Sequence, residues 1–316
     1  MRLAFLGTPD FAATVLRALL ASRHTVAGVI CQPSRPSGRG LAVEEPAVAR
    51  VAREAGLPLL QPAKLLLPET LDSLRALEAE LFVTAAYGRI LKRAWLDLPP
   101  RGCWNVHGSV LPRHRGASPV AASILAGDAW TGITIFQMDE GMDTGAILSE
   151  AMTPIGARET TGELMLRLAA MGGDLLVRTL DRAERGELDP IEQSPDGATY
   201  AGMLEKEDGL LKTHLPVEQI DRQIRAMTPW PGAFAFVGGQ RLRVHRATPL
   251  DRIPRTELHG TLLPRDDGVG LVCAPGLLLL EEVQLDGRKR TAAREWWRGA
   301  RLSPGTRLTG APTTGA

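Results

Sequence analysis

The feature that most restricts the fold of this chain is a set of short apolar runs in its first third. The runs at 3–6, 26–31 and 81–86 are bounded by turn residues, and stretches with helical periodicity separate them. Continuous apolar runs of this length are typical of strands buried on both faces, as in parallel sheets whose strands are joined by crossover helices. The pattern therefore predicts an α/β fold with a mostly parallel sheet and helices on both faces.

The turn after the first strand limits the ligands that this sheet can bind. The segment GTPDF at 7–11 leads into an amphipathic stretch at 12–20, so a helix should begin beside the strand end. A dinucleotide site would need three glycines at fixed intervals there, whereas only Gly7 precedes Pro9. We expect a Rossmann-like sheet without an NAD site.

The length of 316 residues exceeds that of a usual single domain, so two domains are expected. A long helical pattern at 160–185 is followed at 187–210 by prolines, glycines and charges without periodicity. We place the first domain at 1–189, a linker at 190–208 and the second domain at 209–316.

The second domain has the pattern of a small all-β unit. After one helix at 217–227, five short stretches alternate as strands: 233–237, 241–247, 260–263, 270–273 and 277–283. They favour a small OB-like β-barrel. From Pro304 onward the chain is rich in Gly, Pro and Thr, and we expect it to be poorly ordered.

Composition excludes several classes of protein. The net charge is +1 and apolar residues make up 44%, which excludes a disordered or strongly basic chain. Residues 201–316 hold 17 Lys and Arg against 13 Asp and Glu, an excess that fits either a polyanion partner or an ordinary solvated surface. Cys31, Cys103 and Cys273 are far apart without metal-ligand spacing, so they favour buried thiols in a reducing compartment.

The N-terminal apolar run is too short for a signal peptide, and no run approaches the length of a membrane span. We therefore expect a cytoplasmic protein that does not use a membrane. We also expect a monomer.

The segment 32–40 contains two prolines and two glycines around Arg35 and Arg39. It is too rich in helix and strand breakers to form either element, so we expect a mobile basic loop. Such a loop is either a solvated connection or an arm that contacts phosphate.

The segment 103–107 alternates like a strand, which places Asn105 and His107 on the same face. An isolated pair of this kind is more often a hydrogen-bonded core pair than a site. Here the strand leads into the loop 108–116, and open α/β sheets bind ligands at such strand ends. A later turn at 137–145 holds three carboxylates, so an acid can return to the histidine.

The two motifs NVHGSVLPRHRGASP at 105–119 and QMDEGMDTG at 137–145 resemble the signature of the 10-formyltetrahydrofolate-dependent transferases and hydrolases. Further segments are similar to those members of the family that formylate initiator methionyl-tRNA for translation initiation: GTPDF at 7–11, QPSRPSGRG at 32–40, AAYGRIL at 85–91 and RAMTPWP at 225–231. The resemblance extends from about residue 2 to 300.

This resemblance implies that Asn105, His107 and Asp143 are catalytic and that Ser109-Val110-Leu111-Pro112 holds the folate. No metal is implied. In the implied reaction the aminoacyl nitrogen attacks the formyl carbon, and the Asn105 amide and a protonated His107 stabilise the oxyanion. Asp143 orients His107 and favours its imidazolium form, which later protonates the departing tetrahydrofolate.

The resemblance also implies tRNA contacts in both domains. Arg39 matches an arginine that reaches the acceptor end, although Leu41 to Glu45 follow it where the family often has lysines, which predicts weaker contact. The other candidates are Lys206 in the linker and a basic strand with Arg241, Arg243 and Arg246, for which surface solvation is the alternative.

Three alternatives remain at this point. A formyltetrahydrofolate hydrolase shares the motif PRHRGAS at 112–118, and a nucleotide-sugar formyltransferase shares PWPGAF at 229–234. A non-catalytic folate or nucleotide sensor on the same fold would have no need of the intact Asn, His and Asp set.

Overall fold

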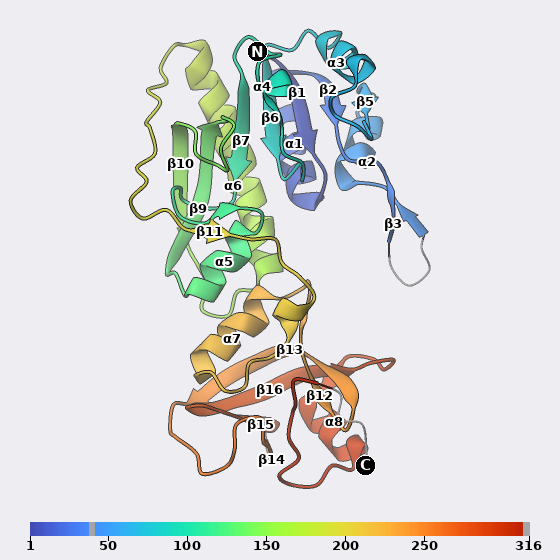
Figure 1. Ribbon diagram of the computed structural model, residues 1–316, viewed down its shortest axis with the longest axis vertical. Helices are drawn as coiled ribbons and strands as arrows, with labels where there is room; N and C mark the ends of the chain where they lie inside the picture. Colours follow the sequence, from blue (N-terminus) through green and yellow to red (C-terminus); the bar gives the residue numbers. More distant parts are fainter. Residues whose placement is uncertain (38–41, 312–316) are drawn as a thin grey trace. The chain divides into compact units, whose positions relative to one another are not determined.

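The structure is a computed structural model that describes residues 1–37 and 42–311. Arg39 lies outside these residues. Within the described part, no helix is long and apolar enough to cross a membrane. The chain divides into two compact units (Figure 1): unit 1 comprises Met1–Pro119, Ala129–Pro154 and Leu164–Gly202, and unit 2 comprises Val120–Asp128, Ile155–Glu163 and Met203–Ala316.

Unit 1 contains a seven-stranded sheet in the order β10-β9-β7-β6-β1-β2-β5. All neighbours are parallel except β9, which is antiparallel to both β7 and β10. This confirms the mostly parallel α/β sheet. The strands are β1 (Arg2–Gly7), β2 (Thr25–Ile30), β5 (Leu59–Leu60), β6 (Leu81–Ala85), β7 (Cys103–His107), β9 (Trp130–Gln137) and β10 (Ile147–Pro154).

Helices cover both faces of this sheet. On one face, Leu74 and Trp95 pack into a core cluster with Phe82 and Cys103 of the strands. Leu74 belongs to α3 (Pro68–Arg75) and Trp95 to α4 (Arg93–Leu96). On the other face, Gly172 of α6 (Thr161–Glu184) lies against strand residues, and α1 (Asp10–Leu20) and α2 (Ala47–Glu54) complete the layer (Figure 1).

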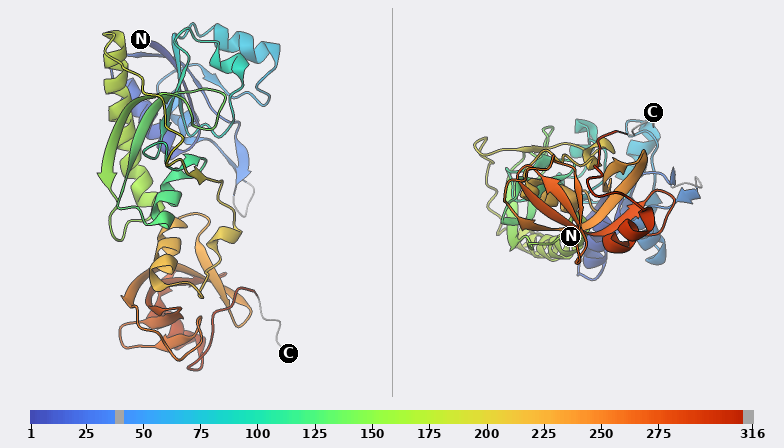
Figure 2. Two further views of the ribbon diagram at one scale, coloured as in Figure 1. Left: turned by 60° about the vertical axis from the view of Figure 1, so that its left-hand side comes forward. Right: turned by 90° about the horizontal axis from the view of Figure 1, so that it is seen from below.

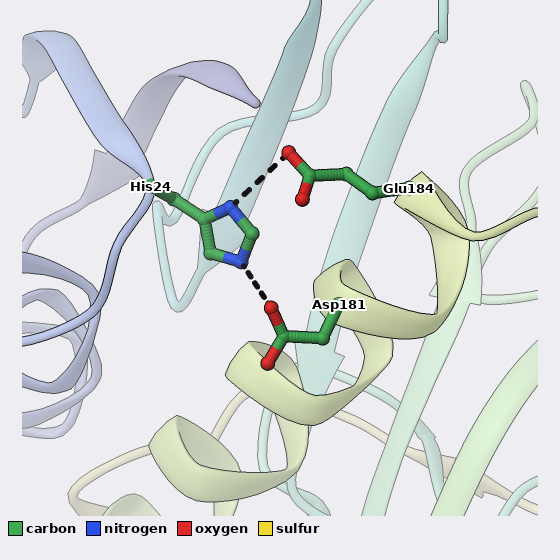
Figure 3. A group of neighbouring side chains, drawn as sticks. All are labelled: His24, Asp181 and Glu184. Atoms are coloured by element: carbon green, nitrogen blue, oxygen red, sulfur yellow. Dashed lines mark ion pairs between the residues drawn. The ribbon is translucent and has the colours of Figure 1, made fainter.

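The last turns of α6 are fixed to the turn before β2 by a group of charges (Figure 3). The buried His24 ring lies 3.4 Å from Asp181 and 3.8 Å from Glu184, and Arg23 pairs with both carboxylates. Burial lowers the pKa of His24. Arg23 and the Met1 amino group, which also pairs with Glu184, therefore balance the charge of the two carboxylates around the ring.

The segment 32–40 differs from our expectation, because it includes a strand. β3 (Arg35–Ser37) pairs with β4 (Ala42–Glu44) in an antiparallel ribbon. A ribbon of two strands leaves alternate N–H groups without a ladder partner, so Pro36 is tolerated in it. Our expectation of a loop rested on the number of prolines and glycines and did not take this tolerance into account.

Unit 2 is built on an antiparallel sheet in the order β12-β13-β16-β15-β14, with β17 added to β16. Its elements are α5 (Pro119–Ala126), α7 (Val217–Ala226), α8 (Ala293–Ala300), a short 3-10 helix (Glu207–Gly209), β12 (Ala233–Val237), β13 (Gln240–Asp251), β14 (Leu262–Pro264), β15 (Val269–Cys273), β16 (Gly276–Leu285) and β17 (Thr291–Ala292). The strands are strongly curled, as the right-hand view of Figure 2 shows.

The final segment of unit 2 joins the two edges of its sheet. Thr309 bridges to Phe236 of the edge strand β12, and Arg307 bridges to Thr261 beside the other edge strand β14. The closure agrees with the expected barrel. Leu308 is only 3% exposed, so the expectation of poor order from residue 304 is wrong for 307–309, because a buried leucine and two bridges fix this segment.

Candidate active site

Asn105 and His107 lie on the same face of β7, near the carboxyl end of this inner strand. Thr84 of β6 is the register partner of Asn105 and donates a hydrogen bond from its hydroxyl to the Asn105 Oδ1 at 2.7 Å. This bond fixes which way the amide points. No described residue accepts from the Asn105 amide N–H groups, which are therefore available to a ligand oxygen.

The His107 ring is 4% exposed and lies between two hydrogen-bond acceptors. Its Nε2 is 3.0 Å from the His114 carbonyl oxygen, and its Nδ1 is 3.6 Å from Asp143 Oδ2. Burial lowers the pKa of His107, and the Asp143 carboxylate opposes this only in part. Asp143 therefore favours the imidazolium form, as we expected from the sequence. The loss of hydration on burial has the larger effect on the pKa, however, and it favours the neutral ring.

In the neutral ring, the proton belongs on Nε2, where the His114 carbonyl accepts it. The Nδ1 lone pair then faces the Asp143 carboxylate. A proton taken up at Nδ1 would remove this unfavourable contact. The arrangement suits a group that gains a proton during a reaction rather than one that holds it beforehand.

Asp143 is held in a strained position by two hydrogen bonds. Its φ is +56°, a conformation that residues with a Cβ seldom adopt. Its Oδ2 accepts a hydrogen bond from the Gly116 N–H at 2.7 Å, and its carbonyl oxygen accepts one from the Gln193 side chain at 2.9 Å. The surrounding chain therefore fixes the carboxylate beside His107.

Gln193 is a supporting residue that we did not predict from the sequence. Its side chain also donates to the Gly145 carbonyl and accepts from Arg115 at 2.7 Å. It lies in a segment that we expected to be a linker, but the chain belongs to unit 1 as far as Gly202, and β11 (Tyr200–Ala201) pairs there with β8 (Arg115–Gly116). No local pattern distinguishes this glutamine from a linker residue.

The segment 109–112, which the resemblance predicts to hold the folate and which we name the folate loop for that expectation, folds back over β9. Thr134 of β9 accepts a hydrogen bond from the Leu111 N–H at 3.1 Å and donates one to the Ser109 carbonyl at 2.8 Å. A Cβ at Gly132 would lie 2.9 Å from Val110 Cγ2, so the absence of a side chain at Gly132 lets Val110 pack against β9.

The side chains of the folate loop have different surroundings. Ser109 is 1% exposed and donates to the Arg113 carbonyl, and Leu111 is 3% exposed. These two side chains shape the loop. Val110 and Pro112 are partly exposed, so a ligand would meet their side chains and the loop backbone.

The candidate tRNA residues of unit 2 lie in different settings. Arg241 and Arg243 share one face of β13, and the Arg241 guanidinium lies 3.5 Å from the centre of the Phe234 ring. Arg246 follows an irregularity in the strand and pairs with Glu281 at 3.2 Å. Lys206 is exposed at the start of the short 3-10 helix.

Two family models match this chain. The model described as formyl transferase matches residues 1–180, and that of the formyl transferase C-terminal domain matches residues 203–301. The methionyl-tRNA formyltransferase of Citrifermentans bemidjiense is 43% identical over 306 residues, which are 96% of this chain and 95% of that protein. That of Marinobacter nauticus is 43% identical over 315 residues, 98% of this chain and all of that protein.

Solved structures share the fold at low identity. The N-formyltransferase from Helicobacter canadensis, solved with folinic acid and dTDP-3-aminofucose, superimposes with a TM-score of 0.65 at 16% identity. The match covers 92% of this chain and 99% of that one.

Proposed function

The chain belongs to the formyl transferase family, and on that premise we propose that it transfers the formyl group of 10-formyltetrahydrofolate to the free amino group of methionyl-initiator-tRNA. The observation that supports this acceptor best is the identity of 43% to methionyl-tRNA formyltransferases over nearly the full length of both chains. The structural neighbour that is named for an amino sugar ligand reaches only 16%.

We propose that Asn105, His107 and Asp143 perform the chemistry. The amino nitrogen of the acceptor forms a bond to the formyl carbon, and the free amide N–H groups of Asn105 stabilise the oxygen that becomes negative. Neutral His107 takes the proton that the nitrogen loses, and Asp143 stabilises the imidazolium. The bond from the formyl carbon to the folate nitrogen then breaks, and that nitrogen receives the proton from His107.

The geometry around His107 supports this order of events. The ring is buried, which lowers its pKa and so favours the neutral form at the start, and both of its nitrogens face acceptors. Uptake of one proton satisfies both contacts, whereas a ring protonated beforehand would have to overcome the cost of burial. No covalent intermediate on the protein is needed, because the acceptor amine is itself the nucleophile.

We propose that the folate loop binds tetrahydrofolate through its backbone and through Val110 and Pro112. For tRNA we propose Arg241 and Arg243 as the main contacts in unit 2, because Arg246 already pairs with Glu281. Arg39 and Lys206 remain proposals by resemblance.

We also propose a cytoplasmic monomer that works without a metal. Among the described residues, His24, Asp181 and Glu184 lie close enough together to hold a metal ion. Arg23 already pairs with both carboxylates, so a cation would have to displace it.

Competition among acceptors tests the proposal. Purified protein receives 10-formyltetrahydrofolate together with methionyl-tRNA, water as solvent and an amino sugar nucleotide. We expect nearly all formyl groups on methionyl-tRNA. Preferential formylation of the sugar, or formate as the main product, would assign the chain to one of the two rival activities.

A further inference from the structure

Three residues form a row across the sheet of unit 1, which we name the cross-strand row. His107 of β7 is the register partner of Thr134 of β9, and Thr134 is the register partner of Glu150 of β10. Register partners in antiparallel strands direct their side chains to the same face. The row therefore runs from the candidate catalytic histidine to the edge strand, beneath the folate loop.

The Thr134 hydroxyl has more partners than it has protons. It is fully buried, accepts from the Leu111 N–H at 3.1 Å, and lies 2.8 Å from the Ser109 carbonyl and 3.2 Å from Glu150 Oε1. A hydroxyl has one proton to donate. Hence the Ser109 carbonyl and the Glu150 carboxyl compete for it.

We propose that Glu150 is a positioning residue for the folate loop and acts through the Thr134 hydroxyl. The proposal rests on the proposed function in one respect, namely that this loop binds folate.

The protonation state of Glu150 decides the competition. An ionised carboxylate accepts a strong, charge-assisted hydrogen bond, so it draws the Thr134 proton away from the Ser109 carbonyl. A neutral carboxyl group donates to the Thr134 oxygen instead, and the hydroxyl proton is then given wholly to Ser109. The neutral form therefore holds both ends of the Ser109–Leu111 turn, and the ionised form holds only one.

The surroundings of Glu150 support a shift within an accessible range. The residue as a whole is exposed on the edge strand, but partial burial of its carboxyl group raises the pKa, which the Thr134 hydrogen bond opposes. The other titratable group in the row is His107, beyond Thr134. Arg182 of α6 contacts Ser149, whose side chain points to the opposite face of the strand.

The direction in which folate affinity changes with pH follows from the linkage between folate binding and protonation of Glu150. Folate binding needs the well-held loop, which neutral Glu150 favours, so bound folate raises the pKa of Glu150 further. Affinity is then highest below that pKa and falls as the pH rises through it. Loss of one hydrogen bond to a buried carbonyl corresponds to a weakening of about threefold to tenfold.

Calorimetric titration with 5-formyltetrahydrofolate between pH 4.5 and 8 tests this, using the full chain without tRNA. Glu150→Gln imitates the neutral carboxyl, since its amide N–H donates to Thr134. It should therefore remove the fall in folate affinity that occurs as the pH rises through the pKa of Glu150. Glu54→Gln, an exposed carboxylate on α2, is the control and should keep the profile of the original protein.

Two substitutions of Thr134 separate positioning from a general structural effect. Thr134→Val should weaken binding by about tenfold at every pH, because both loop hydrogen bonds are lost. Thr134→Ser keeps the hydroxyl and should restore both affinity and pH profile. Identical profiles for Glu150→Gln and the original protein would overturn the inference, whereas absence of folate binding in the original protein would instead overturn the proposed function.

Discussion

At the scale of single residues, His107 has a structure that permits a direct test. One ring nitrogen faces a carbonyl at 3.0 Å and the other a carboxylate at 3.6 Å, and in the proposed reaction this ring carries the proton. We expect His107→Asn to lower kcat/KM by about 10²- to 10⁴-fold. The thermal midpoint, measured on the same sample, should change little. Turnover close to that of the original protein would show that His107 does not move the proton.

The pH dependence of kcat/KM tests the role of Asp143. The proposed reaction needs neutral His107, so activity should be lost as the pH falls through the lowered pKa of this ring. Asp143 raises that pKa against the effect of burial. Asp143→Asn should therefore move the acidic limb to lower pH, in addition to reducing kcat/KM by on the order of 10²-fold.

An acidic limb that stays in place, or moves to higher pH, would contradict the pairing of Asp143 with His107. Glu140→Gln in the same turn is the matched control, since its carboxylate is exposed and lies 3.8 Å from Arg93 instead. It should leave both the limb and the rate unchanged.

At the scale of elements, the folate loop depends on a glycine in the strand below it. A Cβ at Gly132 would lie 2.1 Å from the Ala151 carbonyl oxygen of β10. The backbone of β10 would have to shift to make room, because a flexible side chain is not the obstacle. We expect Gly132→Ala to lower the free energy of unfolding by about 1–3 kcal/mol and to raise the KM for the folate substrate. Urea denaturation and steady-state kinetics measure the two effects.

Gly202→Ala is the control for this substitution. A Cβ at Gly202 meets no atom within 4 Å, so its unfolding free energy should change by less than about 0.5 kcal/mol. Equal stability of both variants would mean that the strand pair accommodates a side chain beneath Val110.

Several elements could be predicted from the sequence because their signals are local. The apolar run at 81–86 became β6, and the alternation at 103–107 became β7 with Asn105 and His107 on one face. The long helical pattern became α6, whose start has a Thr160 and Glu163 capping box. In each case, local periodicity and tertiary burial agree.

Other features depend on contacts between distant segments. The ribbon of β3 and β4 is stabilised by pairing rather than by its residue types, and Leu308 is ordered by the barrel that it helps to close. Gln193 supports Asp143 across 50 positions of sequence. The lowered pKa of His107 could not be predicted either, because it depends on how completely the ring is buried.

At the scale of the whole molecule, the basic strand of unit 2 should contribute to tRNA affinity without affecting the chemistry. Arg243→Ala should weaken binding of initiator tRNA by about tenfold and reduce the slope of log affinity against log salt by about one. Arg265→Ala is the control, because Arg265 already pairs with Asp267. An unchanged salt slope in Arg243→Ala would mean that this strand is an ordinary solvated surface.

Transfer of the formyl group to methionyl-tRNA can be followed in one reaction by measuring both products. Protein and 10-formyltetrahydrofolate are incubated with and without initiator methionyl-tRNA, and tetrahydrofolate and formyl-methionyl-tRNA are quantified together. We expect slow release of tetrahydrofolate without tRNA, and rapid release with tRNA that matches formyl-methionyl-tRNA one for one. Release of formate at the same rate in both reactions would contradict it.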